Sequence, residues 1–86
     1  MNQKQTYMCP ICGYPGLDEP PYDEYGCASF DICPCCGVEY GYHDCTTPHV
    51  ELRQRWIALG MPWSHPPSPS GWDPEKQLRD ADMDRQ

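Results

Sequence analysis

The sequence predicts a small α+β fold that is dominated by a metal centre. Two short segments, residues 9–13 and 33–37, each read Cys-Pro-x-Cys-Gly. Leu, Ile, Val and Phe together supply only ten of the 86 residues, whereas Pro and Gly supply eighteen. A small chain with so few aliphatic side chains cannot bury enough apolar surface to offset the entropy lost on folding, so it needs a metal or disulfides. The seven cysteines therefore indicate what holds the fold together.

Three features favour a metal over disulfide bonds. Residues 1–6 contain no apolar stretch that could act as a secretion signal. The cysteine count is odd, which would leave one thiol unpaired outside the cell. Two cysteines three positions apart also suit a shared ion better than a cross-link between distant segments. We therefore expect a cytoplasmic protein without a membrane anchor, because no apolar run approaches the ~20 residues needed to span a bilayer.

The paired turns identify the expected metal ligands. In each turn Pro tightens the loop and Gly frees the backbone after the second cysteine, so that both thiolates can face one ion. Two such loops complete a tetrahedron of sulfurs, which is the closed geometry of structural zinc. We predict that one Zn²⁺ is bound per chain, with iron as the rival metal. The predicted ligands are Cys9, Cys12, Cys33 and Cys36.

The remaining elements are expected in a simple order along the chain. Residues 1–6 should be a disordered tail, and residues 7–60 should form a zinc-ribbon-like domain in which short β-hairpins carry the two knuckles. Residues 61–72 contain four prolines and two tryptophans, which favour an extended segment held against the body. Residues 73–86 should form a short polar helix or a frayed tail. The fold is thus a pair of knuckles followed by one or two helices.

A helix over 48–59 is expected to pack on the ribbon. Thr47 can cap it, Pro48 suits its first turn, and Gly60 can end it. Apolar side chains recur at helical spacing on one side of this segment, which predicts the face that is buried. These side chains are Leu52, Trp56 and Leu59, with Ile57 beside them.

The surplus cysteines and histidines leave two readings open. They could form a second metal site, or they could be ordinary side chains that bind nothing, and no repeated spacing supports the site. The residues concerned are Cys27, Cys35, Cys45, His43 and His49. Cys35 is expected to point away from the ion, because it directly precedes Cys36 and adjacent side chains diverge. His65, in the proline-rich segment, is expected to be solvated.

Charge and site chemistry exclude several functions. The net charge is −7, and no Lys or Arg occurs between Lys4 and Arg53, so the basic stripe that nucleic-acid binding needs is missing. A four-thiolate zinc has no open position for catalysis, so no enzyme is expected. The acidic, tyrosine-rich surface predicts another protein as the partner. The alternative is a redox sensor or zinc store that uses the surplus cysteines.

Residues 7–44 resemble the bacterial cysteine-rich CPCC family of small zinc-binding proteins. The resemblance rests on residues 9–14 (CPICGY), residues 17–20 (LDEP) and residues 32–36 (ICPCC), although the CPCC string here lies in the second knuckle rather than the first. It implies a zinc-ribbon-like fold in a bacterium and brings no established activity with it. Similar genes lie beside toxin systems, so the resemblance also raises an immunity role.

Overall fold

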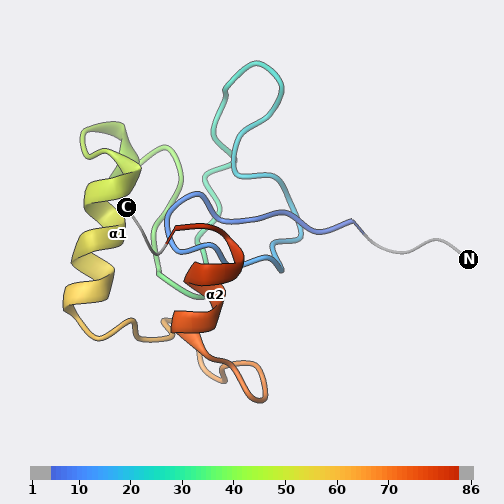
Figure 1. Cartoon of the computed structure of the whole chain (residues 1–86). Helices are drawn as coiled ribbons and strands as arrows, with labels where there is room; N and C mark the ends of the chain where they lie inside the picture. Colours follow the sequence, from blue (N-terminus) through green and yellow to red (C-terminus); the bar gives the residue numbers. More distant parts are fainter. Residues whose placement is uncertain (1–4, 84–86) are drawn as a thin grey trace, which may run out of the picture.

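The computed structural model describes residues 5–83, and its two α-helices lie against a centre built from turns (Figure 1). A single 3₁₀ turn, η1 (His43–Cys45), precedes the helix α1 (His49–Ala58), and a second helix, α2 (Pro74–Asp80), follows near the end. The expected tail falls largely on residues 1–4, which lie outside the described residues. No helix within residues 5–83 is both long and apolar enough to cross a bilayer.

The expected hairpins shrink to isolated pairings between neighbouring segments. Residues 5–83 contain three single antiparallel bridges, Tyr7 with Leu17, Tyr22 with Ala28 and Ile32 with Glu39, and no longer strand. Two of these bridges close the bases of the two knuckles. The knuckle turns and the nearby prolines leave too few residues on either side to extend a ladder, because Pro cannot donate to one. The small fold with two α-helices is as expected, whereas the zinc-ribbon hairpins stay a prediction.

Helix α1 falls within the expected range 48–59, but it begins differently from the prediction. The N-cap is Pro48, no side chain caps the helix, and the prediction of a Thr47 cap is therefore wrong. Instead, the Pro48 carbonyl accepts hydrogen bonds from Glu51 and Leu52 at 3.1 Å. Gly60 follows the helix with φ of 95°, and its N–H donates to the Ile57 carbonyl at 2.9 Å. Gly60 thus ends the helix as expected, since a left-handed residue there favours glycine.

The buried face of α1 differs from the predicted apolar stripe at two positions. Leu52 and Trp56 are buried as expected, but Leu59 is 77% exposed and Arg53 is only 4% exposed. Leu59 is the C-cap residue, so its side chain lies beyond the last full turn that packs on the body. The Trp56 indole donates to the Pro62 carbonyl at 2.9 Å and fastens the chain as it leaves the helix.

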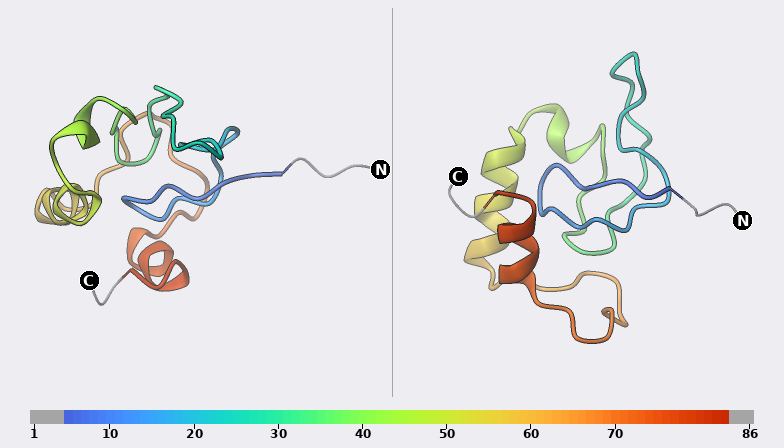
Figure 2. Two further views of the ribbon diagram at one scale, coloured as in Figure 1. Left: turned by 90° about the horizontal axis from the view of Figure 1, so that it is seen from above. Right: turned by 45° about the vertical axis from the view of Figure 1, so that its right-hand side comes forward.

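The segment between the helices crosses the second knuckle. Trp63 lies edge-on between two other rings, with centroids 5.2 Å from Tyr14 and 5.1 Å from Trp72. Helix α2 then begins at a strong cap, where the Asp73 side chain accepts from the N–H groups of Glu75 and Lys76. Both helices lie beside the knuckles, while the loop around residues 20–28 projects away from them (Figure 2).

Sulfur rather than hydrocarbon fills the centre of the molecule. Four cysteines have no exposed surface at all: Cys9, Cys12, Cys33 and Cys35. Few aliphatic side chains join them, among them Ile11, Leu17 and Val38. The stability of the core therefore depends on the interactions among the cysteines, as the small number of aliphatic residues predicts.

Candidate metal centre

The first knuckle is a tight turn closed by two backbone hydrogen bonds. The N–H of Cys9 donates to the Tyr14 carbonyl at 2.8 Å, and the N–H of Gly13 donates back to the Cys9 carbonyl at 3.0 Å. Gly13 has φ of 82°, and a Cβ added there would lie 2.8 Å from the Cβ of Ala81, just after α2. Only glycine therefore serves both the turn and the close approach of the α2 end.

The second knuckle repeats the same turn. The N–H of Cys33 donates to the Val38 carbonyl, and the N–H of Gly37 donates to the Cys33 carbonyl, both at 2.9 Å. Gly37 has φ of 79°, close to that of Gly13. The repeated sequence thus gives a repeated structure, with each pair of cysteines presented from one edge of its turn.

The two knuckles bring four sulfurs together. The Sγ atoms of Cys9 and Cys36 are 3.8 Å apart, and those of Cys12 and Cys33 are 3.7 Å apart. Each pair joins the first cysteine of one knuckle to the second of the other, and all four Sγ atoms lie within 4.8 Å of one another. A disulfide would require an S–S distance of about 2.05 Å, far shorter than either of these separations. A regular tetrahedron of sulfurs about 2.3 Å from a zinc ion has edges of about 3.8 Å. The four cysteines could therefore hold a metal ion.

The close approach of the sulfurs shifts the pKa values of the four thiols in different directions. The hydrogen bond with Cys12 holds the pKa of the Cys33 thiol below its usual range, and the same bond raises the pKa of Cys12. The hydrogen bond with Cys12 also lowers the pKa of Cys9. Because only thiolates bind metals well, this arrangement makes two of the four sulfurs ready to lose their protons.

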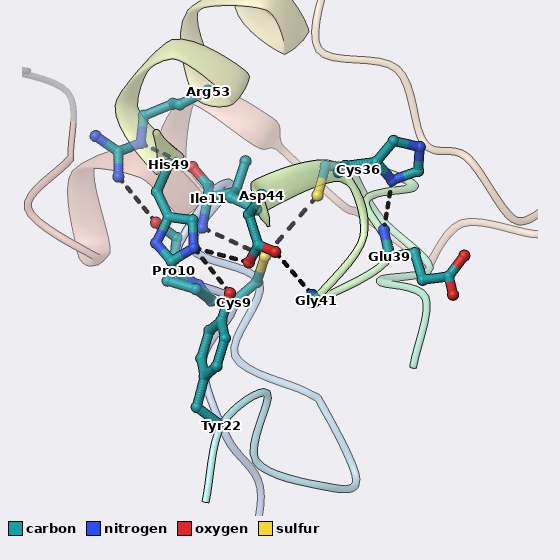
Figure 3. A network of polar contacts seen from close by, with 11 residues as sticks. Cys9, Pro10, Ile11, Tyr22, Cys36, Glu39, Gly41, Asp44, His49 and Arg53 are labelled. Carbon is teal, nitrogen blue, oxygen red and sulfur yellow. Dashed lines mark hydrogen bonds and ion pairs between the residues drawn. The ribbon is translucent and has the colours of Figure 1, made fainter. Parts of the chain in front are cut away.

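Arg53 of α1 places a buried positive charge beside the first knuckle. Its Nε donates to the Ile11 carbonyl at 2.7 Å and its Nη2 donates to the Pro10 carbonyl at 2.9 Å (Figure 3). Burial lowers the pKa of Arg53, and the charges of Cys9 and Cys12 act in the opposite direction. A guanidinium remains charged under such conditions. Arg53 thus satisfies two carbonyls of the first knuckle and balances part of its negative charge.

The second knuckle has its matching carbonyls satisfied by backbone. The N–H of Ser64 donates to the Cys35 carbonyl and the N–H of His65 donates to the Pro34 carbonyl, both at 2.9 Å. Equivalent oxygens in the two turns are therefore bound in two ways, by a charged side chain in the first and by the proline-rich segment in the second. The His65 side chain is exposed, as expected, and the residue contributes through its main chain.

Gln77 ties α2 to the centre. Its Nε2 donates to the Cys12 carbonyl at 2.9 Å and lies 3.5 Å from the Cys35 Sγ. The Trp72 indole in turn donates to the Gln77 Oε1 at 2.8 Å, which fixes the orientation of the amide. Both helices thus place one polar side chain on the backbone of the first knuckle.

Two proteins of Bacillus subtilis (strain 168) are similar to the chain over most of its length. The match to YozI is 39% identical over 95 residues and covers 91% of this chain and 74% of YozI. The match to YoaQ is 40% identical over 80 residues and covers 73% of this chain and 67% of YoaQ. The chain belongs to the YoaQ and YozI family. Both relatives are described as uncharacterized proteins.

No family model matches this YoaQ and YozI family member, so its resemblance to the CPCC family stays a prediction. No solved structure matches it either. The candidate site therefore rests on the geometry of the chain itself.

The surplus sulfur and imidazole groups of this family member are not gathered into a second cluster. Among residues 5–83 the four knuckle cysteines are the one group of three or more metal-binding side chains that converge. Cys35 is fully buried outside that group, at the position equivalent to Ile11 in the first knuckle. Cys27 and Cys45 are exposed. Cys35 thus fills space in the core as Ile11 does.

His43 and His49 both make hydrogen bonds that stabilise neighbouring loops. The His49 Nε2 lies 3.0 Å from Asp44 Oδ2 and 2.9 Å from the Tyr22 hydroxyl, which links the start of α1 to the projecting loop (Figure 3). The His43 Nδ1 accepts from the N–H of Glu39 at 2.9 Å. These contacts explain the two residues without a metal.

Sequence reasoning missed Arg53 and Gln77, the two side chains that reach the knuckle from the helices. One signal was available for Arg53, since it lies beside Leu52 within the apolar stripe and is the first basic residue after Lys4. Gln77 carries no comparable signal, because a glutamine in a polar helix gives no hint of burial.

Proposed function

We propose that this protein binds one Zn²⁺ through Cys9, Cys12, Cys33 and Cys36, and that the ion holds its fold together in the bacterial cytoplasm. The sulfur spacing supports the proposal, because two opposite edges of the cluster, at 3.7 and 3.8 Å, match the edge of a zinc tetrathiolate. Iron in the same site is the rival, and it would give the protein a visible colour.

The proposed centre is structural rather than catalytic. Four protein thiolates fill a tetrahedral ion completely, so neither water nor substrate can bind to it. Three of the four cysteines are fully buried and the fourth is half-buried, which also keeps solvent from the ion. A closed, buried centre fits a scaffold whose surface carries the function.

The function that this scaffold supports best is binding to another protein. Large side chains stand exposed on the loops that the knuckles carry: Tyr25 at 83%, Tyr42 at 66% and Phe30 at 62%. Aromatic side chains are favoured anchors at protein interfaces. The acidic residues around them would favour a partner with a basic surface and would repel nucleic acid.

Metal analysis of the reduced protein tests the structural role. We expect one zinc per chain, and loss of the circular dichroism spectrum of the fold when a chelator removes it, because structural zinc supplies roughly 10–16 kcal/mol in small domains at neutral pH. Readdition of zinc should restore the spectrum. A metal-free sample that unfolds cooperatively would refute the proposal, and two metals per chain would change the ligand assignment.

A redox or zinc-storage role is the second candidate, because Cys27 and Cys45 are exposed and available to oxidants. Thiol titration of the zinc-loaded protein separates the two roles. A sensor predicts that mild oxidation of these two thiols releases zinc. A structural scaffold predicts that they can be alkylated with the metal retained.

A further inference from the structure

Tyr40 carries a buried hydroxyl that lacks a hydrogen-bond partner. The residue is 1% exposed, and its hydroxyl is the buried side-chain polar atom that finds no partner among the described residues. The position of the side chain is fixed, because the Tyr40 N–H donates to the Asp31 carbonyl at 3.1 Å and its ring packs edge-on against Tyr22. Buried polar groups are normally satisfied, so an unsatisfied one in a fixed position calls for an acceptor.

Tyr40 is packed in the same buried core as Cys9 and Cys33, whose sulfurs are the candidate acceptors for its hydroxyl. Burial raises the pKa of Tyr40, and the charges of Cys9 and Cys33 raise it further. A tyrosine hydroxyl is an ordinary O–H donor at neutral pH, so it can donate to a sulfur beside it. Cys9 and Cys33 occupy equivalent places as the first cysteines of the two knuckles.

Metal loading would change these sulfurs into much better acceptors. A neutral thiol is a weak acceptor, whereas a metal-bound thiolate carries negative charge and accepts hydrogen bonds well. Four thiolates around a divalent ion leave two negative charges uncompensated. Arg53 and the Ile11 N–H, which lies 3.4 Å from the Cys9 Sγ, meet part of that charge from the first knuckle.

We propose that Tyr40 donates an O–H···S hydrogen bond to a metal-bound thiolate of the Cys9 and Cys33 pair, and so acts as a positioning residue that strengthens metal binding. The proposal rests on the proposed metal site. It assigns to Tyr40 the part that outer hydrogen-bond donors play at metal centres, where their loss commonly lowers metal affinity 10–100-fold.

Substitution of Tyr40 by Phe removes the hydroxyl and keeps the ring. The matched control is Tyr42→Phe, the same change two residues away on a side chain that is 66% exposed. Full-length chains would be loaded with Co²⁺, whose sulfur-to-metal charge-transfer bands report on thiolate hydrogen bonding, and zinc affinity would be measured by competition with a chelator. Alkylation of the bound thiolates by iodoacetamide gives a third measure.

For Tyr40→Phe we expect zinc affinity to fall about 10–100-fold, the charge-transfer bands to move to longer wavelength, and the bound thiolates to be alkylated faster. Tyr42→Phe should match the original protein in all three. Without metal, the Tyr40→Phe and original chains should both lack the circular dichroism spectrum of the fold, so the two should differ only when metal is bound.

The outcomes separate this inference from the function on which it rests. If the original chain binds no metal, the proposed metal site fails. If the original chain binds metal and Tyr40→Phe shows the same affinity and band positions as Tyr42→Phe, the hydrogen bond to sulfur is refuted. In that case water entering from the surface cavity that Tyr40 lines with Leu17 and Asp31 satisfies the hydroxyl instead.

Discussion

The guanidinium of Arg53 donates through Nε to the carbonyl of Ile11 at 2.7 Å, across 42 positions of sequence. This bond joins α1 to the first knuckle, and Gln77 of α2 makes the corresponding bond to the carbonyl of Cys12. The two helices bury Leu52, Trp56 and Leu78 in the core, and these polar side chains also fasten them to the first knuckle. Because these side chains bind the backbone of the first knuckle, an ordered knuckle and correctly docked helices depend on each other.

Replacement of Arg53 by Met should destabilise the zinc-loaded protein by about 2–4 kcal/mol. Met keeps much of the side-chain volume but leaves the carbonyls of buried Ile11 and half-buried Pro10 without those donors, and each such loss costs about 1–3 kcal/mol. Urea unfolding in excess zinc measures the change. The control Arg55→Met removes an exposed ion pair with Glu51 and should cost less than about 1 kcal/mol. Equal effects of the two changes would contradict the role given to Arg53.

The sequence predicts the metal cluster far better than it predicts the contacts that support it. The ligand geometry is local, because Cys9 and Cys12 are placed by one turn and Cys33 and Cys36 by its repeat. The burial of Arg53 depends instead on a carbonyl some 42 positions away, which no periodic pattern encodes.

The errors in the predicted elements have the same origin. Thr47 is a good capping residue by type, yet the chain enters α1 with Pro48 at the cap. Leu59 continues the apolar spacing, yet the helix ends before that position can reach the body. The knuckles predict hairpins, but the turns use up the residues that a ladder would need. Local preference thus predicts turns and helices well, whereas packing decides their ends.

Substitution of Cys9 by Ser should abolish the fold, while Cys27→Ser should leave it intact. Cys9 is fully buried in the sulfur cluster, whereas Cys27 is exposed and lies outside it. A serine hydroxyl replaces a thiolate poorly at zinc, so the variant should lose both the metal and the binding free energy that orders the chain. Zinc content and circular dichroism on the two variants provide the measurement. Loss of structure in both variants would mean that Cys27 has a role that the cluster does not explain.

Acidification should release the metal and unfold the protein together. Zinc needs thiolates, so protons compete with it at all four sulfurs. In the folded chain the pKa values of Cys9 and Cys33 are lowered, so the folded state binds fewer protons there than the unfolded state does. Their contribution to stability is therefore complete above the usual thiol pKa of about 8.5 and is lost as the pH falls below it.

A pH titration that follows zinc release with a coloured indicator and folding by circular dichroism checks this coupling. The two curves should coincide, with stability decreasing toward acid. A fold that persists after the indicator has taken up the zinc would separate metal binding from folding and would count against the structural role of the ion.

Two glycine substitutions should separate backbone strain from steric conflict at the knuckle. Gly13 and Gly26 have nearly the same φ, 82° and 81°, so Ala at either position pays the cost of a left-handed conformation, about 1–2 kcal/mol. A Cβ at Gly26 meets nothing within 4 Å, whereas one at Gly13 lies 2.8 Å from the Cβ of Ala81 and 3.4 Å from the Gln77 carbonyl. Gly13→Ala must therefore also push the end of α2 away from the knuckle.

We expect Gly26→Ala to lower the free energy of unfolding by about 1–2 kcal/mol with unchanged zinc affinity, since its loop lies away from the sulfurs. Gly13→Ala should cost at least about 1–3 kcal/mol more, the range for overpacking, and should also weaken zinc binding because Gln77 moves with α2. Urea unfolding and chelator competition on both variants provide the comparison. If the two substitutions cost the same, the contact between α2 and the first knuckle is not under the steric constraint that Gly13 relieves.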